Sequence, residues 1–183
     1  MQIPILMKNK QQPSYDAVTV QPMRDELTSV GCKELLTPED VDKALDRSDG
    51  KTMLVVINSV CGCSAGSARP GVMMALQNGI IPNELYTLFG GMEKDAIDRY
   101  RSKYLPNHQT SSPHIALFRN GDPLIIFKRS DIDGYAAESI ANELAAIFNK
   151  ECNNTGPSIS AKDFENITQG KHGCYTDLSK NKE

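Results

Sequence analysis

The chain has 183 residues, a length that suits one domain or one domain with a short appendage. Its formal net charge of −3 and its lack of a basic stripe argue against binding to nucleic acid or to an anionic membrane surface. The longest apolar run, residues 53–57, is far shorter than a membrane span of ~20 residues, and the first ten residues do not resemble a secretory signal, so we expect a cytoplasmic protein.

The first part of the chain predicts two helices and a strand. After an N-terminal arm of about 20 residues, residues 22–30 favour a short helix. Thr37 is a typical N-cap with Pro38 at the first helical position, which predicts a second helix ending near Gly50. The β-branched run 53–57 is too short for a helix and predicts a buried strand.

The middle of the chain predicts a second strand between two helices. Apolar residues from Ala65 to Leu76 recur at helical spacing, and Pro70 inside this stripe predicts a kink. Residues 85–89 predict the strand, and residues 93–104 favour the helix that follows it.

The last third of the chain predicts a hairpin and a final helix. Strands at 114–118 and 123–128 flank the Asn-Gly pair at 120–121, the strongest short hairpin signal in the chain. A helix over 135–151 follows. Polar residues dominate from 153 to 183, so we expect a partly ordered C-terminal extension and no second core.

The order of these elements is that of the thioredoxin fold. The strand–helix–strand unit gives a right-handed parallel crossover, and the terminal hairpin makes the sheet mixed. Helices then cover both faces. We therefore predict an α/β domain over residues 1–152, with a central mixed four-stranded sheet, extra N-terminal helices and the polar extension 153–183.

Two of the five cysteines stand where a strand meets a helix. Cys61 and Cys63 directly follow the 53–57 strand, and a helix N-terminus favours the reactive thiolate. Cys61 is therefore the expected nucleophile and Cys63 the resolving thiol, with Gly62 keeping the turn free of side-chain bulk. Because a Cys-x-Cys bridge must distort the first helical turn, we expect a labile disulfide suited to exchange.

Further residues are expected to serve this site. Ser112 and Pro113 precede the third predicted strand, where thioredoxin-like proteins place a cis proline that leaves the backbone open to a substrate peptide. The neighbouring hydroxyl groups could donate hydrogen bonds to sulfur, and Arg69 could bind carboxylates of a small thiol. The candidate hydroxyl donors are Ser59, Ser64 and Ser67.

The segment from Val56 to Pro70, which contains Cys-Gly-Cys, resembles the bacilliredoxins, as do residues 22–27 and 111–113. The resemblance covers roughly residues 15–152. It implies a thioredoxin fold, no bound metal or cofactor, and reduction of mixed disulfides between cytosolic proteins and bacillithiol, a small thiol that serves as co-substrate. It also implies partners that are S-thiolated proteins.

The resemblance also assigns roles to the two cysteines. Cys61 would attack the mixed disulfide and take up the bacillithiol, and free bacillithiol or Cys63 would then release it. Weak disulfide isomerase activity is associated with the family, so an isomerase is an alternative. A second alternative is a non-catalytic thiol- or metal-binding module in which His172 and Cys174 supply further ligands.

The remaining cysteines carry weaker expectations. Cys32 is expected to pack near a helix end. Cys152 is either a spare thiol or an exchange partner of the site, and Cys174 is expected on the surface of the polar tail.

Overall fold

A computed structural model describes residues 11–109 and 111–169. Its centre is a five-stranded sheet in the order β1-β4-β2-β5-β6. The first three strands run parallel, β5 is antiparallel to β2, and β6 is antiparallel to β5. The four predicted strands are confirmed, and a short edge strand is added. The strands are β1 (Lys33–Glu34), β2 (Thr52–Asn58), β4 (Glu84–Phe89), β5 (His114–Arg119) and β6 (Asp122–Phe127).

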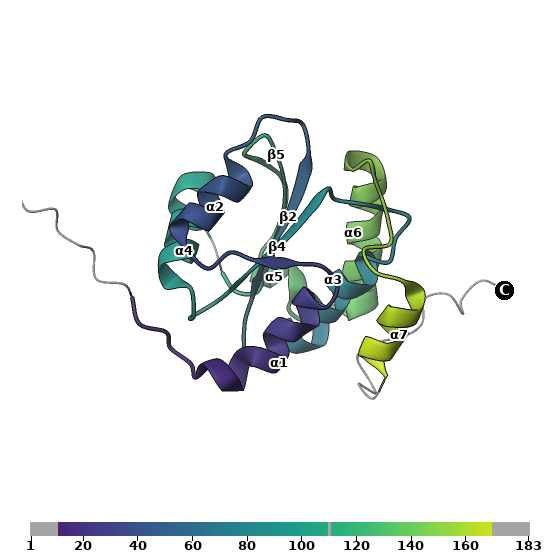
Figure 1. Cartoon of the computed structure of the whole chain (residues 1–183), viewed down its shortest axis with the longest axis horizontal. Coiled ribbons are helices and arrows are strands. Elements are labelled where there is room, and N and C mark those ends of the chain that lie inside the picture. Colours follow the sequence, from purple (N-terminus) through teal and green to yellow (C-terminus); the bar gives the residue numbers. More distant parts are fainter. Residues whose placement is uncertain (1–10, 110, 170–183) are drawn as a thin grey trace, which may run out of the picture.

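One face of the sheet is covered by α2 (Pro38–Leu45) and α4 (Lys94–Arg99), which continues as the π-helical turn η2 (Tyr100–Tyr104) (Figure 1). Thr37 caps α2 as predicted. Its hydroxyl accepts the Asp40 N–H at 3.1 Å, and the Asp40 carboxylate accepts the Thr37 N–H at 2.9 Å. The core of this face includes Val41, Leu45, Met53, Ile57, Ile97, Tyr100 and Phe118.

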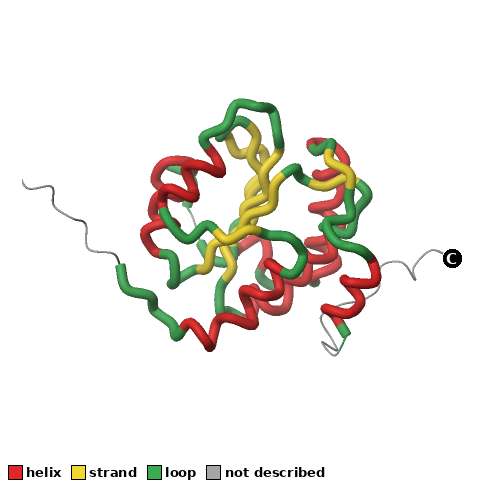
Figure 2. The backbone as a smooth tube through the Cα atoms, in the orientation of Figure 1, coloured by secondary structure: helices red, strands yellow, loops and turns green. Residues whose placement is uncertain are grey.

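The other face is covered by α1 (Ala17–Thr28), α3 (Arg69–Ala75) and α6 (Ala137–Glu151). Figure 2 shows the strands as a central layer with helices on either side, which is the thioredoxin-like arrangement that the sequence predicts. Gly71 lets α3 and α6 approach closely, because a Cβ atom there would lie 2.9 Å from Ile140. The core of this face includes Leu27, Leu54, Val56, Val72, Leu76, Leu144 and Phe148.

The first helix begins earlier than predicted. Asp16 is its N-cap and accepts the Thr19 N–H at 3.0 Å, so α1 starts at Ala17 and Pro22 lies in its second turn. The prediction of a helix over 22–30 followed the apolar residues Met23, Leu27 and Val30, which begin only in the second turn of the observed helix. The N-terminal arm is correspondingly shorter.

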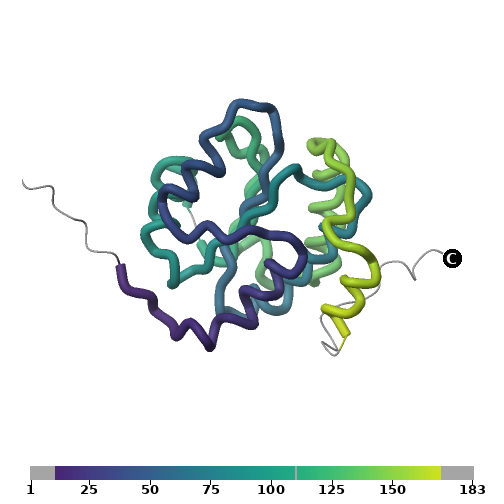
Figure 3. The backbone as a smooth tube through the Cα atoms, in the orientation of Figure 1, coloured from purple at the N-terminus to yellow at the C-terminus, as the bar shows by residue number. Residues whose placement is uncertain are grey.

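The segment after Cys152 packs against the domain. β7 (Asn154–Thr155) pairs antiparallel with β3 (Ile80–Ile81), and α7 (Ala161–Thr168) follows. Figure 3 shows this last part of the described chain running beside α6. Three of its side chains are partly buried against the α3–α6 side of the core: Ile159, Phe164 and Ile167.

A short helix, α5 (Arg129–Ile132), follows β6 and completes the architecture. Within residues 11–109 and 111–169, none of the helices has the length and apolar character that crossing a bilayer requires.

Candidate active site

Cys61 lies at the start of a helical segment that follows the carboxyl end of β2. Residues 62–75 are helical, and the N–H groups of Ser64 and Ala65 donate to the Cys61 carbonyl oxygen at 3.1 and 3.2 Å. The Ser64 N–H also reaches the Cys61 sulfur at 3.3 Å. The thiol therefore occupies the place of an N-cap side chain, and the predicted strand-to-helix junction is confirmed.

The first part of this helix is a π-helical turn, η1 (Ser64–Ala68), and α3 follows it. Pro70 has no N–H to donate to the carbonyl group of Gly66, four residues earlier. The wide turn ends just before this proline, so the predicted kink takes the form of a π-helical turn. Such turns are frequent at functional sites.

Three donors surround the Cys61 sulfur. The Ser59 hydroxyl lies 3.1 Å away, the Ser64 N–H 3.3 Å and the Cys63 sulfur 2.7 Å. Both thiols are free and partly exposed. Of the three predicted serine donors, Ser59 acts through its hydroxyl and Ser64 through its backbone, whereas the Ser67 hydroxyl donates to a distant carbonyl group.

The two thiols differ in acidity. Partial burial alone would raise the pKa of Cys61, but the bonds from Cys63, Ser59 and the Ser64 N–H outweigh it, with help from the charge of Arg129, and the pKa is lowered. Burial, followed by the bond to Cys61, raises the pKa of Cys63. The arrangement favours a thiolate on Cys61 and a proton on Cys63.

Arg69 lies inside the protein, only 4% exposed. Its Nε donates to Glu26 at 2.7 Å. Its Nη1 donates to the Asn58 side-chain oxygen at 3.0 Å, to the Ser59 carbonyl at 2.9 Å and to the Ser64 hydroxyl at 3.2 Å. The expectation that Arg69 binds substrate carboxylates is corrected, because these buried contacts occupy the guanidinium. Arg69 instead positions the turn that carries Cys61.

Gly62 is exposed and has an ordinary backbone conformation. It is not among the described glycines with a positive φ, and a Cβ atom there would meet nothing within 4 Å. The turn therefore does not require the conformational freedom of glycine, although the absence of a side chain leaves the space beside the two sulfurs open.

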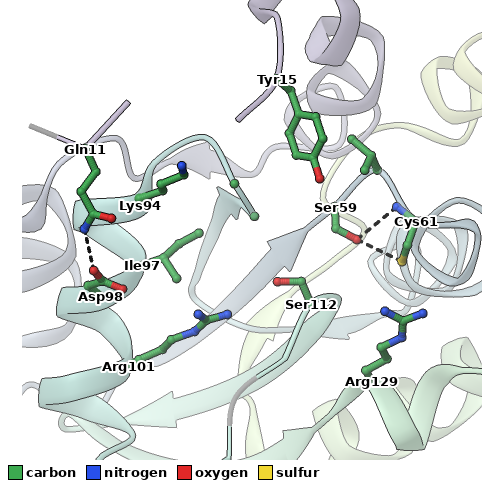
Figure 4. Close-up of a pocket in the computed structure, with 13 residues that line it drawn as sticks. Gln11, Tyr15, Ser59, Cys61, Lys94, Ile97, Asp98, Arg101, Ser112 and Arg129 are labelled. Carbon is green, nitrogen blue, oxygen red and sulfur yellow. Dashed lines mark hydrogen bonds between the residues drawn. The ribbon is translucent and has the colours of Figure 1, made fainter. Parts of the chain in front are cut away.

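Cys61 opens into a pocket of about 430 Å³ (Figure 4). The Ser112–Pro113 peptide bond is cis, as predicted, and Ser112 lines the pocket directly before β5. Gly90 packs between this residue and β2, because a Cβ atom on it would lie 2.9 Å from the Ser112 hydroxyl oxygen. Of the predicted substrate-binding residues, the structure thus places Ser112 beside Cys61.

Three cationic residues of the pocket were not predicted from the sequence. Lys94, Arg101 and Arg129 come from α4, η2 and α5, and all line the pocket. In Figure 4 the Arg129 guanidinium points toward Cys61. Single basic residues on short helices have no sequence pattern that distinguishes them from solvated ones. A glycine at the end of a strand can mark a place where another backbone or a ligand approaches closely. The pair Gly90-Gly91, which ends the second predicted strand, could therefore have indicated this part of the pocket.

The two other cysteines in the described part of the chain, Cys32 and Cys152, lie away from this site, and Cys174 lies outside that part. Cys32 is buried, and burial raises its pKa to about 12. Burial also raises the pKa of Cys152, which the Thr52 hydroxyl contacts at the amino end of β2. Because β2 has seven residues, at ~3.3 Å each, about 20 Å separates Cys152 from the Cys61 turn. Cys152 is therefore too far away to exchange with Cys61 within one molecule.

The metal-binding alternative depends on residues outside the described part of the chain. His172 and Cys174 both lie there. Among the residues that are described, no three His, Cys, Asp or Glu side chains gather in a way that could hold a metal ion.

Comparisons with known proteins point to one family. A family model described as disulphide isomerase matches residues 15–152. A bacilliredoxin of Salinibacter ruber is 42% identical over 147 residues, covering 80% of this chain and 86% of its own length. A bacilliredoxin of Halalkalibacterium halodurans is 44% identical over 138 residues, covering 75% and 94%. A solved structure described as having a thioredoxin fold is 20% identical, with a TM-score of 0.44, and covers 61% of this chain and 91% of its own.

Proposed function

The chain belongs to the bacilliredoxin family, which the disulphide isomerase model describes, and we propose that it removes bacillithiol, or a similar small thiol, from cytoplasmic proteins. The names of its relatives support a thiol redox enzyme. The observation that carries the finer function is the Cys61 sulfur, which three donors stabilise at the mouth of a pocket.

The first step is an exchange at the mixed disulfide. The Cys61 thiolate attacks the sulfur of the small thiol, a new disulfide forms between Cys61 and that sulfur, and the protein sulfur leaves as a thiolate that takes a proton from water. The lowered pKa of Cys61 increases the fraction of thiolate that can attack.

The second step frees Cys61. In one route a second small thiolate attacks the sulfur of the bound small thiol, a disulfide forms between the two small thiols, and Cys61 leaves as a thiolate. In the other route the Cys63 thiolate attacks the Cys61 sulfur, and the bound small thiol leaves as a thiolate. With Cys63 the product is a Cys61–Cys63 disulfide, which an external thiol must reduce again. The sulfur of Cys63 lies 2.7 Å from that of Cys61, so little movement is needed. No bound metal or cofactor takes part in either step.

The test uses a peptide with one cysteine held in a mixed disulfide with bacillithiol. The reduced full chain is added, and the intact masses of peptide and protein are followed. We expect the wild type to release the peptide thiol, Cys61→Ser to release none, and Cys63→Ser to accumulate the small thiol on Cys61. Cys152→Ser is the matched control, because that thiol is also partly exposed but lies far from the site. Transfer at the wild-type rate by Cys61→Ser would overturn the proposal.

Disulfide isomerisation is the second candidate, favoured by the description of the matching family model. It needs a thiolate at Cys61 but no pocket for a small thiol. Reactivation of scrambled ribonuclease, measured beside the peptide assay, separates the two functions. Rapid reactivation with no transfer of bacillithiol would favour the isomerase.

A further inference from the structure

The pocket beside Cys61 carries an excess of positive charge. Its charged lining consists of Lys94, Arg101 and Arg129 against a single carboxylate, Asp98. That carboxylate already accepts a hydrogen bond from the Gln11 side chain at 2.7 Å. An anionic group entering the pocket would therefore meet a favourable field.

Arg101 is the pocket cation that lies on η2. Its Nε is buried and has no hydrogen-bond partner in the described part of the protein. Its neighbours on the same helical segment behave differently: Arg99 and Lys103 both pair with Asp42 on α2. Figure 4 shows Arg101 extending toward the centre of the pocket. Because a buried N–H without an acceptor is costly, this orientation indicates a ligand that supplies one.

The remaining geometry suits a small acidic thiol. Arg129 points toward the Cys61 sulfur, and Arg101 extends from the opposite side of the pocket with Ser112 between them. The volume of about 430 Å³ falls within the ~300–1,000 Å³ of small-molecule sites. The N-terminal arm closes one wall, where the Ser14 N–H donates to the Gly91 carbonyl oxygen at 2.7 Å. A pocket of this size, with the arm as one wall, favours a small molecule over an acidic segment of a protein.

We infer that Arg101 and Lys94 form a carboxylate-binding subsite that holds the acidic part of the small thiol while its sulfur reacts with Cys61. The inference rests on the proposed function and deepens it, because it names the residues that hold the group removed. The exchange itself is unchanged, with one disulfide broken and one formed at Cys61.

The first test compares two reagents that both exchange with a thiolate. One is anionic, 5,5′-dithiobis(2-nitrobenzoate), and the other is neutral, 2,2′-dithiodipyridine. Every protein compared carries Cys63→Ser, which keeps the adduct on Cys61, and adduct formation there is quantified by peptide mass mapping. We expect Arg101→Gln to slow the anionic reagent about tenfold, with a larger loss when Lys94→Gln is added. The rate with the neutral reagent should stay within about twofold, and added salt should shrink the difference.

The matched control is Arg99→Gln, two residues away on the same helical segment but paired with α2. It should change neither rate, and Arg101→Lys should retain most of the preference for the anion. Equal slowing of both reagents, no slowing of the anionic one, or an equal effect in Arg99→Gln would overturn the subsite. Since this reaction needs only the Cys61 thiolate, its result does not depend on whether proteins are substrates.

The second test identifies the source of the carboxylate. Peptides with acidic or neutral flanks are prepared as mixed disulfides with bacillithiol or with neutral 2-mercaptoethanol. A loss in Arg101→Gln that follows the charge of the small thiol supports the subsite, and a loss that follows the charge of the peptide overturns it. The wild type could transfer neither thiol while Arg101→Gln still slows only the anionic reagent of the first test. In that case the proposed function fails and the subsite stands.

Discussion

Reactivity at Cys61 depends on individual donors that can be removed one at a time. The Ser59 hydroxyl lies 3.1 Å from the sulfur and favours the thiolate. We predict that Ser59→Ala raises the pKa of Cys61, so that alkylation by iodoacetamide reaches half its maximal rate at a higher pH than in the wild type. The rate at Cys61 is followed by peptide mass mapping across the pH range.

Ser67→Ala is the control for this change. It removes a hydroxyl from the helical segment that follows Cys61, but that hydroxyl donates to the Tyr135 carbonyl oxygen. The midpoint of the wild-type pH profile should lie below the ordinary pKa of a thiol, and Ser67→Ala should not move this midpoint. An equal shift in both serine variants would contradict the role of Ser59.

A second residue-level prediction concerns the buried thiol of Cys32. Burial raises its pKa to about 12, from the 9.0 that we take for the unfolded chain. Between these values the unfolded chain has lost a proton that the folded chain retains. The contribution of Cys32 to stability is therefore complete below pH 9.0 and is lost as the pH rises, by up to ~1.4 kcal/mol per pH unit.

Urea unfolding of Cys32→Ala at a series of alkaline pH values tests this sign. The variant is expected to be less stable near neutral pH because a cavity replaces the sulfur. Its free energy of unfolding should, however, decline less steeply above pH 9.0 than that of the wild type. Parallel declines would show that Cys32 does not titrate in this way.

At the level of elements, Arg69 joins the start of its helix to α1 and to the end of β2. Its contacts with Glu26 and with Asn58 are largely shielded from water. We predict that Arg69→Ala lowers the free energy of unfolding by about 3 kcal/mol, because it leaves buried polar groups without partners. Arg99→Ala, which breaks a more exposed pair, should cost less than about 1 kcal/mol. Similar urea midpoints for the two variants would contradict the prediction.

Two glycines of one helical segment allow a matched comparison. A Cβ atom on Gly71 would lie 2.9 Å from Ile140 of α6, whereas one on Gly62 would meet nothing within 4 Å. We predict that Gly71→Ala destabilises the protein by about 2 kcal/mol through overpacking. Gly62→Ala should be neutral or slightly stabilising, because alanine favours a helix. Thermal unfolding of both variants tests this order, and the reverse order would contradict the packing of α3 on α6.

Across the whole molecule, the sequence predicted helix starts and turns well where the residues that determine them are neighbours in the chain. The Thr37 cap and the Asn-Gly turn at 120–121 act within a few residues, and both positions are confirmed. The start of α1 was missed because the apolar residues that predicted the helix begin at Met23, after the cap at Asp16. The edge strand β1 was missed because two residues carry too little pattern to predict a strand.

The site was predictable only where its residues are neighbours in sequence. Cys61 and its strand-to-helix junction could be found because the signal is local. The role of Arg69 was predicted wrongly because its partners lie on α1 and β2, and only the fold shows that they surround it. Arg101 was missed for the same reason: its position differs from that of Arg99 only through the direction in which the helix presents it.

The segment after Cys152 gives a prediction for the molecule as a whole. Phe164 and its two apolar neighbours cover part of the core, and β7 pairs with β3. Deleting residues 153–183 should lower the free energy of unfolding by about 3 kcal/mol, since three half-buried apolar side chains are lost. No residue of 153–169 lines the pocket at Cys61. The rate of Cys61 alkylation in the folded truncated protein should therefore stay within about twofold of the rate in the full chain. Phe164→Ala in the full chain should cost only part of this stability. Unchanged stability after deletion would contradict the packing, and a large change in the rate at Cys61 would show that the segment also supports the site.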